Sequence, residues 1–562
     1  MLIYKRQYIY IISTLIISGL LLGCSNYLDV DTDTDNSTVA PINQLLPNIG
    51  IATSNLVDYN FWSGDMLSVY MHQTVAREEQ DQYGTRPNNI LLNNDWNNVY
   101  LGLTDIETLI QQSEAEGATV YLGIAQLLKA YFMSVAVDMW GDVPFTEATQ
   151  LTSGVVSPVF DDGQGIYQAS LDLIDEAKIN LSNPTGLLPG TDDFYYAGST
   201  TKWIKFANTF KLKLLNQIRL SSLFNQTDLD ALMAENNFFT SNSDDFQFTH
   251  TATVSPQDER NQLFQGAYGG AQVTYYISPW FYEILQGMNP DIHTGNVDPR
   301  VPYYWANQLQ PGQFPRDQAN TVTMDPRADY WDASTGFFTI RFGSIGPDRD
   351  GAVPNDATFP GIFPCGGRFD DGLGFARTTA SGTGVVPRRI LTYDEFLYIQ
   401  AELMNEGLIT GDSGAKLTEA MTASFAKVDQ VVAGSGTAQT VPVLSGAPIV
   451  TSFIDNVNDE FVAASPDKKL EIIMTQKWVA TFGDPMDQYN DYRRTGYPVL
   501  ANPNGINEYQ LDNGDGYPLL DSDTVLNNPF QVTFFWPENE LNLNQNAPAQ
   551  KDPAAFKVFW DN

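Results

Sequence analysis

The sequence predicts a mostly α-helical protein, in which paired amphipathic helices form a scaffold and a large loop-rich region contains short strands and helices. Two observations predict this fold class. Apolar residues recur at helical spacing in separate blocks before residue 240 and after residue 390. Between about 241 and 390 this period disappears, and Gly, Pro, Asn and aromatic residues crowd together. Long structured loops on a rigid scaffold are where ligands usually bind, so we expect the ligand side there.

The first predicted helix pair spans 96–113 and 120–140, and Gly117 and Gly141 end the two helices. Helices joined by a short turn pack antiparallel. Further helices with the same apolar period are predicted at 166–181, 201–220, 392–406, 417–432 and 470–482. The succession of helix pairs favours a repeat of the tetratricopeptide type, although the match to that repeat's consensus is poor.

The first 23 residues are typical of a secretory signal peptide. Lys5 and Arg6 give a basic start, and 8–22 form an apolar stretch. That stretch of about 15 residues is shorter than the roughly 20 that a membrane span needs. The alternative is an uncleaved N-terminal anchor, but no basic segment follows to stop transfer.

The cysteine after this stretch, Cys24, follows Leu-Leu-Gly, and the four residues resemble the bacterial lipobox. The resemblance implies cleavage before Cys24 and its acylation. Several acyl chains would hold the protein in the membrane, because each buried CH₂ contributes about 0.8 kcal/mol. We therefore predict residues 24–40 to be a lipidated acidic tether.

Alternating aspartates at 29–35 suggest a calcium loop, but the EF-hand pattern fails at Asn36 and Ile42, where it requires Gly and Glu. Acidic residues at this place are similar to the signal that displays Bacteroidetes surface lipoproteins on the outer face. A plain solvated spacer is the alternative.

The composition restricts the partners. The formal net charge is −37, from 67 acidic and 30 basic residues. Nucleic acid is excluded, because binding it means neutralising phosphates with Lys and Arg. Charged residues make up 17% and aromatic residues 12%, so Asn, Gln, Ser, Thr and Tyr supply most polarity. That mixture suits an uncharged ligand rich in hydroxyls or amides, and equally a Tyr-rich core with a neutral surface.

Motifs for cofactor chemistry are missing from the sequence. It contains no G-x-S-x-G, P-loop, HExxH or CxxC, and His72, His250 and His293 are far apart. We predict no cofactor and no metal, with a calcium ion at 348–351 as an open alternative. Lipidation of Cys24 would leave Cys365 without a disulfide partner, and we expect a packed thiol there.

Five segments resemble SusD/RagB-like outer-membrane lipoproteins. They are GDVPFTEA (141–148), VDPRVPYYW (297–305), RRILTYDEFLYIQAEL (388–403), the QKW and RRTGYP block within 472–500, and FWPENELNLN (535–544). Together with the lipobox they span essentially the whole mature chain, and their order and spacing are similar to the family pattern. Pro144, Arg493 and Arg494 in these segments are expected to stabilise the scaffold through a fixed φ and forked ion pairs.

The resemblance implies one SusD-like domain over 41–562, with the helical scaffold at 41–240 and 390–500 and the ligand side at 241–390. It also implies a surface-exposed lipoprotein that captures a nutrient and delivers it to a SusC-like TonB-dependent β-barrel, over which it acts as a lid. An oligosaccharide is the expected cargo, and a peptide is the alternative. No catalysis is expected.

Ligand contacts are predicted from chemistry, because flat aromatic rings offer apolar faces to sugars while Tyr and Trp keep a polar tip. The candidate aromatic residues are Tyr83, Trp280, Tyr282, Tyr303, Tyr304, Trp305, Tyr330 and Trp331. Asp298 and Arg300 are candidate polar contacts. Core packing is the alternative for each ring, and we expect only a few to be exposed.

Two other classes compete with nutrient binding. A glycoside hydrolase needs two carboxylates flanking the scissile bond. Adjacent aspartates occur at 161–162, 192–193 and 370–371, but adjacent residues rarely present opposed carboxylates. A surface adhesin or structural subunit is the third class.

Overall fold

The computed structural model describes residues 40–76, 82–269, 275–315, 329–343, 356–500 and 528–561. The helices of the N-terminal half are α2 (Ile42–Asn55), α3 (Gly64–Tyr70), α4 (Ile90–Glu116), α5 (Thr119–Trp140), α6 (Gly163–Ser182), α7 (Thr200–Gln217) and α8 (Gln226–Glu235). Those of the loop-rich region are α9 (Gln262–Phe264), α10 (Pro279–Leu285), α11 (Val301–Tyr304) and α12 (Ile362–Cys365). The C-terminal helices are α13 (Tyr393–Asn405), α14 (Ser413–Gly434), α15 (Pro448–Ala463), α16 (Pro466–Ala480), α17 (Pro485–Thr495) and α18 (Glu538–Leu543).

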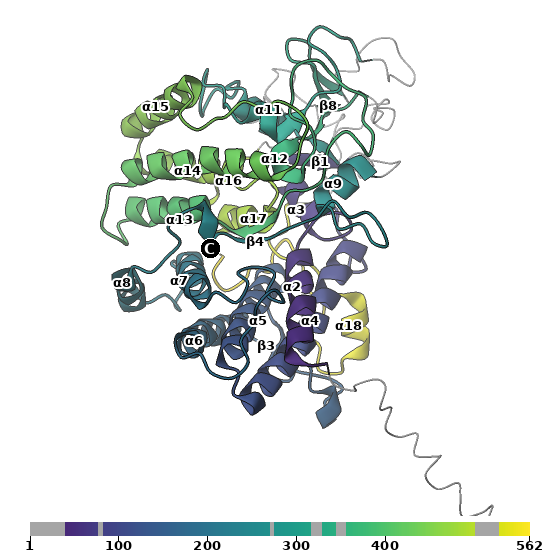
Figure 1. Cartoon of the computed structure of the whole chain (residues 1–562), viewed down its shortest axis with the longest axis vertical. Coiled ribbons are helices and arrows are strands. Elements are labelled where there is room, and N and C mark those ends of the chain that lie inside the picture. The colour runs from purple at the N-terminus through teal and green to yellow at the C-terminus, as the bar shows by residue number, and fades with distance from the viewer. Residues whose placement is uncertain are drawn as a thin grey trace, which may run out of the picture.

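Helix α5 is the centre of the N-terminal half, with α4 and α6 packed against it (Figure 1). Almost all its residues are buried, which explains why it is apolar on every side. It is the one described helix long and apolar enough to cross a membrane, and 89% of its most apolar window is buried inside the protein. α5 is therefore a core helix in this fold.

The two glycines that were predicted to end the first helix pair lie at the C-terminal ends of α4 and α5. α4 begins after Asn89, whose side chain accepts a hydrogen bond from the Leu91 amide, and ends at Gly117 with φ +66°. α5 ends at Gly141, whose φ of +74° favours glycine. The helices predicted at 96–113 and 120–140 are confirmed as α4 and α5.

The remaining predicted helices are also confirmed, as α6, α7, α13, α14 and α16. In Figure 1, α13, α14 and α15 lie in layers above α6, α7 and α8, with α16 beside α14. α13 packs on α14, α16 and α7, so it joins the C-terminal layers to the N-terminal half. The mostly α class with stacked helix pairs is therefore correct.

The region between the two helical halves consists of loops, short helices and short strands, as predicted. Every described strand belongs to a two-stranded antiparallel pair. The pairs are β1 (Thr74–Ala76) with β5 (Tyr275–Ile277), β2 (Val143–Pro144) with β3 (Phe160–Asp161), β4 (Phe246–Phe248) with β10 (Arg388–Leu391), β6 (Trp305–Ala306) with β9 (Phe359–Pro360), and β7 (Asp329–Asp332) with β8 (Phe337–Ile340). Pair β1–β5 ties the N-terminal half to this region.

The arginine side chains of helix α17 form buried ion pairs and hydrogen bonds with neighbouring segments. Arg494 forms an ion pair with Glu402 of α13 and a 2.8 Å ion pair with Asp491, and Arg494 and Glu402 are fully buried. Arg493 donates to the Val532 carbonyl at 2.7 Å. Forked guanidinium contacts of this kind fix the position of a helix. The prediction that Arg493 and Arg494 stabilise the scaffold is confirmed.

Candidate ligand-binding site

The predicted tryptophans and tyrosines of segments 280–282 and 304–305 lie in the core. Trp305 is fully buried, with its ring centroid 5.7 Å from that of Phe281 and 5.9 Å from that of Phe337. Tyr304 stacks on Phe363 at 5.1 Å. Trp280 and Tyr282 are buried as well, at 2% and 0% exposure. Tyr282, Tyr304 and Trp305 pack on other rings, and the Trp280 indole donates to the Val499 carbonyl at 3.2 Å. Their burial keeps a ligand away from all four rings.

Tyr303, Tyr330 and Tyr83 are also buried, and their hydroxyls are already engaged. The Tyr303 hydroxyl donates to the Pro442 carbonyl at 2.6 Å. The Tyr330 hydroxyl donates to Glu283 at 2.7 Å, and that of Tyr83 lies 2.7 Å from Nε2 of His72. The prediction of an aromatic ligand platform is therefore wrong for every ring of the set except Trp331.

The two predicted polar contacts form a buried clamp instead. Arg300 is fully buried and pairs with Asp298 at 2.6 Å. It also donates to Ser424 of α14 at 3.0 Å and to Gln476 of α16 at 2.9 Å. Burying a guanidinium requires this many partners. Asp298 and Arg300 therefore fix the loop before α11 to two helices, and the prediction of ligand contact is wrong for both.

Trp331 differs from the others because it is only partly buried. Its ring meets that of Phe314, which is 40% exposed, edge to face at 5.3 Å and 82°. Within the described ranges, the indole N–H of Trp331 is buried and has no hydrogen-bond partner. The partly buried ring of Trp331 and the exposed ring of Phe314 offer apolar faces on which a ligand can stack. We call Trp331 and Phe314 the aromatic corner.

A second exposed aromatic residue, Phe61, was missed by sequence reasoning. It is 66% exposed and lies on a turn in which Val57, Asn60 and Phe61 all have positive φ. Such strain in non-glycine residues persists only where surrounding contacts enforce it, and it clusters at functional sites. Asn60 donates to Gln262 at 3.1 Å, so this turn borders the loop-rich region. No sequence pattern reveals a positive φ at an aromatic residue.

Two buried carboxyl groups enforce the turn. Asp95 accepts from the amides of Val57 and Ser63 at 2.8 and 2.7 Å, and Asp65 accepts from those of Asn60 and Phe61. Burial raises the pKa of Asp65 to about 7 and that of Asp95 to about 6. Both groups are thus withdrawn from water and act on the backbone that presents Phe61.

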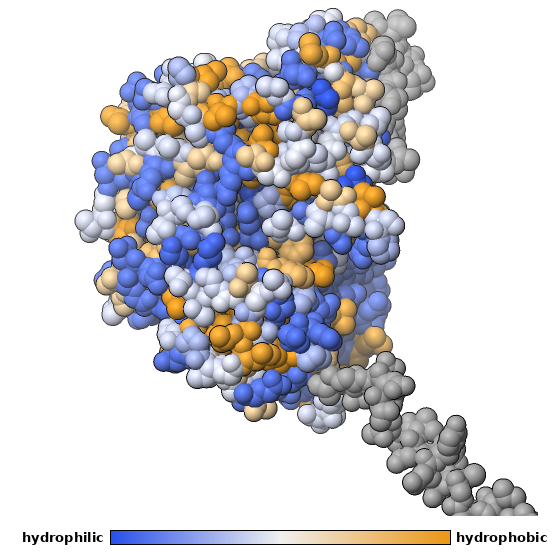
Figure 2. All heavy atoms as spheres, in the orientation of Figure 1, coloured by the Kyte–Doolittle hydropathy of each residue, from blue (hydrophilic) through white to orange (hydrophobic). Residues whose placement is uncertain are grey.

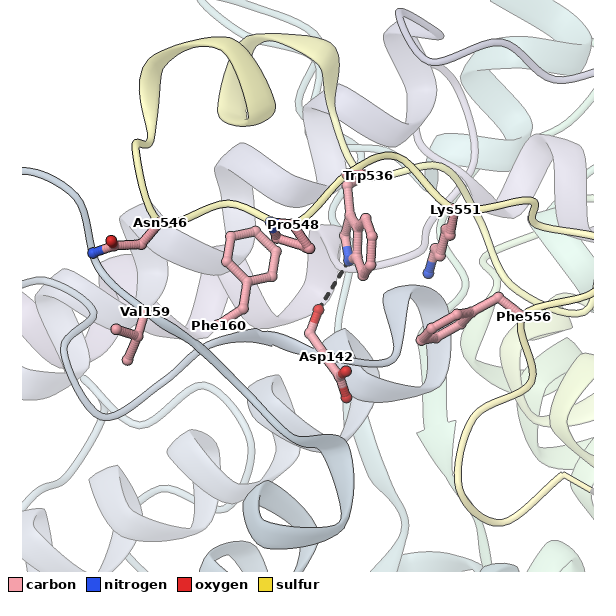
Figure 3. A pocket seen from close by; sticks show the side chains of 9 residues that line it. Asp142, Val159, Phe160, Trp536, Asn546, Pro548, Lys551 and Phe556 are labelled. Carbon is pink, nitrogen blue, oxygen red and sulfur yellow. Dashed lines mark hydrogen bonds between the residues drawn. The ribbon is translucent and has the colours of Figure 1, made fainter.

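A cavity of about 640 Å³ opens between strand β3 and the C-terminal segment (Figure 3). Ligand pockets commonly have volumes of about 300–1,000 Å³. The residues that line it are Asp142, Val159, Phe160, Trp536, Asn546, Pro548, Ala549, Lys551 and Phe556. We call this cavity the C-terminal pocket.

Three rings form the walls of the C-terminal pocket. Trp536 meets Phe160 edge to face at 5.7 Å and Phe556 at 5.7 Å. The Trp536 indole donates to the Asp142 carbonyl at 2.9 Å, which fixes the ring (Figure 3). A Cβ on Gly141 would lie 2.6 Å from the Phe556 ring, so glycine is required there. The glycine that ends α5 also makes room for a pocket wall.

The C-terminal pocket carries one charge of each sign. Asp142 accepts from the Gly163 amide at 3.0 Å through one carboxylate oxygen. Lys551 donates to the Trp140 carbonyl at the end of α5, and its ammonium lies 4.5 Å from the Trp536 centroid and 4.6 Å from that of Phe556. Burial lowers the pKa of Lys551 well below its usual value, and Asp142 opposes that shift.

The adjacent aspartates have structural partners. Asp161 accepts from the amides of Phe145 and Thr146, each at 2.8 Å. Asp193 accepts from the indole of Trp203 at 2.7 Å, and Asp370 accepts from Asn307 at 2.7 Å. Each carboxylate is held by neighbouring backbone or side chains, which is the arrangement of turn-forming aspartates.

Among the residues that the structure describes, no group of three His, Cys, Asp or Glu could hold a metal ion. Cys365 is free and buried, as predicted, and burial raises the pKa of its thiol. The candidate calcium loop at 348–351 and the candidate lipidation site Cys24 lie outside the described residues.

The stacked helix pairs with an inserted loop-rich region define a class of mostly helical proteins, and comparison with known proteins identifies the family within it. A family model described as "Starch-binding associating with outer membrane" and named SusD-like matches residues 34–330 and 366–518. This is most of the chain, and the protein therefore belongs to the SusD-like family. A comparison with curated proteins found no match.

Solved structures share the fold at low sequence identity. A SusD homolog from Bacteroides fragilis is 20% identical with a TM-score of 0.63, covering 90% of this chain and 94% of its own. A SusD/RagB family protein from Bacteroides thetaiotaomicron is 21% identical with a TM-score of 0.63, covering 93% and 99%. A chitin-binding SusD homolog from Flavobacterium johnsoniae is 18% identical with a TM-score of 0.62, covering 93% and 98%.

Proposed function

We propose that this protein is a surface-exposed outer-membrane lipoprotein, anchored through Cys24, that captures an oligosaccharide and delivers it to a SusC-like TonB-dependent transporter as its lid. Membership of the SusD-like family is the observation that carries the proposal. The segment from Lys5 to Cys24 supports export and lipidation. Residues 41–562 act as one domain in this proposal.

The cargo assignment has three supports. The family description names starch, and one solved relative is described as chitin-binding; both are neutral polysaccharides. The acidic surface, with a net charge of −37, disfavours polyanionic ligands. Figure 2 shows hydrophobic residues in small groups among hydrophilic ones over the face seen in Figure 1, a surface on which single aromatic groups can meet sugar rings.

The aromatic corner is the proposed primary ligand surface, and Phe61 is a separate candidate contact. Within the predicted ligand side, Trp331 offers a partly buried ring and Phe314 an exposed one. No reaction is proposed at this surface. The protein's role is to bind, while the barrel and its energy source perform transport.

Titration of residues 25–562 tests the cargo and the surface together. We expect a neutral oligosaccharide of the starch or chitin type to bind with Kd between about 1 μM and 1 mM, and short peptides not to bind. Trp331→Ala should weaken binding at least about tenfold, which corresponds to the loss of roughly one stacked ring. Isothermal titration calorimetry measures both.

Phe194→Ala is the matched control, because Phe194 is 41% exposed but lies between α6 and α7 in the helical scaffold. It should bind like the unaltered chain. Binding of peptides alone would replace the saccharide assignment, and equal weakening by Phe194→Ala would remove Trp331 from the site.

A further inference from the structure

The C-terminal pocket is separate from the proposed primary surface. The pocket lies at the end of α5, between β3 and the segments on either side of α18, whereas the aromatic corner lies on β7 and in the segment after β6. In Figure 1, β3 and α18 are in the lower half and β8 is at the top. Nothing in the proposed delivery to a transporter uses this pocket.

The free polar groups of the pocket define its ligand. In the described part of the chain, the second carboxylate oxygen of Asp142 makes no hydrogen bond. The side-chain amide of Asn546 donates to the Ser157 carbonyl at 2.6 Å, and its side-chain oxygen makes no hydrogen bond within the described residues. Lys551 uses one of its three N–H groups on Trp140. The pocket thus presents both acceptors and donors, as hydroxyl groups require.

The charges exclude ions of either sign as good ligands. An anion would approach Lys551 but would also meet Asp142 and the C-terminal carbonyls of α5, which carry partial negative charge. A cation would approach Asp142 and would be repelled by Lys551 in its protonated form. A neutral ligand escapes both penalties, because hydroxyls accept from Lys551 and donate to Asp142.

The rings supply the remaining part of the recognition. Phe160 and Phe556 are partly exposed at the mouth, and Trp536 is buried behind them. Val159 is 38% exposed and extends the apolar wall. Figure 3 shows Phe160, Trp536 and Phe556 around the opening, with Asp142 and Lys551 between them. Apolar rings beside paired donors and acceptors match the faces and hydroxyls of a pyranose.

We infer that the C-terminal pocket is a second saccharide site, which binds a neutral sugar unit at a place distinct from the aromatic corner. The inference rests on the proposed saccharide cargo. Two sites on one chain would raise the retention of a long glycan that spans both, because the second contact forms at high effective concentration.

The test fills the pocket without disturbing the core. Ala549 is exposed and lines the pocket, so Ala549→Trp places an indole in the cavity while Trp536 and Lys551 stay in place. Ala555→Trp is the matched control, an exposed alanine of the same segment that does not line the pocket. Both are made in residues 25–562 carrying Trp331→Ala, so that only the second site is measured. Unchanged thermal unfolding curves establish that both variants are folded.

The probes are neutral trisaccharides of the starch and chitin type, trigalacturonate and a chitosan trimer, measured by calorimetry and saturation-transfer NMR. A neutral trisaccharide should bind the Trp331→Ala protein, and Ala549→Trp should weaken that binding at least about tenfold while Ala555→Trp leaves it unchanged. Equal binding by the two tryptophan variants, no residual binding after Trp331→Ala, or a preference for either charged trisaccharide would overturn the second site.

These outcomes separate the two proposals. Binding that is lost with Trp331→Ala and unaffected by Ala549→Trp in the otherwise unaltered chain overturns the second site alone and leaves saccharide capture standing. No binding of any neutral saccharide by the unaltered chain overturns both.

Discussion

Replacing Arg388 by methionine is expected to lower the free energy of unfolding by about 3–5 kcal/mol, the cost of leaving buried charges without their partner. Arg388 is 3% exposed and joins three segments. Its guanidinium lies 3.4 Å from Asp58 and 3.3 Å from Asp484. It also donates to the carbonyls of Val57 at 3.2 Å and Gly483 at 2.9 Å.

The size of the effect follows from what remains after the change. Asp58 and Asp484 would stay buried without this cation, and burial already raises the pKa of each to about 6 although Arg388 opposes the shift. Two carbonyl groups would also lose a donor. Because Val57 belongs to the strained turn that presents Phe61, the loss should also disturb that turn.

Arg368→Met is the matched control, since Arg368 pairs with Asp371 at 3.1 Å near the surface. Exposed pairs of this kind contribute about 0–1 kcal/mol. Arg388→Lys should fall between the two, because it keeps the charge and loses the fork. Urea denaturation measures all three. Equal midpoints for Arg388→Met and Arg368→Met would contradict the buried-network account.

Replacing Trp305 by alanine is expected to lower the free energy of unfolding by about 3–5 kcal/mol, as for other buried Trp→Ala changes. Trp305 is fully buried, and its ring lies against Phe281, Tyr282 and Phe337. Truncation would leave a cavity between rings that belong to separate elements. The effect should appear as a lower urea midpoint, while the saccharide affinity of the folded fraction stays unchanged.

Trp331→Ala is the comparison variant, because we expect it to change saccharide affinity more than stability. Trp331 is partly buried against Phe314, so its truncation should cost less than about 2 kcal/mol and reduce affinity instead. If Trp305→Ala weakened saccharide binding without lowering stability, Trp305 would have to be a ligand contact and its assignment to the core would be incorrect.

The helices were predictable where apolar residues alone hold them. α4 and α5 carry both a helical apolar period and a glycine at the end, and both helices were predicted, although α4 begins at Ile90, six residues before the predicted start. α17 was not predicted, because its buried residues are mostly polar and find ionic partners on other elements. Periodicity of apolar residues cannot reveal a helix held by charges.

Helix α15 (Pro448–Ala463) was also not predicted, for a different reason. Val450, Phe453, Val457 and Phe461 lie on its buried face at helical spacing, so the sequence does contain the apolar period of this helix. The loops, short strands and short helices of the loop-rich region were predicted correctly. The pairing of its strands was not predicted, because pairs such as β4 with β10 join segments far apart in the chain.

The ligand site was the least predictable part. The identity of an aromatic residue does not reveal whether its ring is exposed or buried. Here most of the candidate rings are buried, and several pack on one another. The C-terminal pocket combines Asp142 with Trp536, from two segments that resemble family signatures and were interpreted as scaffold. Only the fold brings these segments together, since the Trp536 indole binds the Asp142 carbonyl.

Purification of the full chain from its native outer membrane in mild detergent tests the central claim most directly. The protein should elute with a TonB-dependent β-barrel in near-equal amounts, and mass spectrometry should find acyl groups on Cys24 as the first residue. Added neutral oligosaccharide should remain bound to that complex. Recovery of the chain alone, unacylated and without saccharide, would contradict its role as a nutrient-capturing lid.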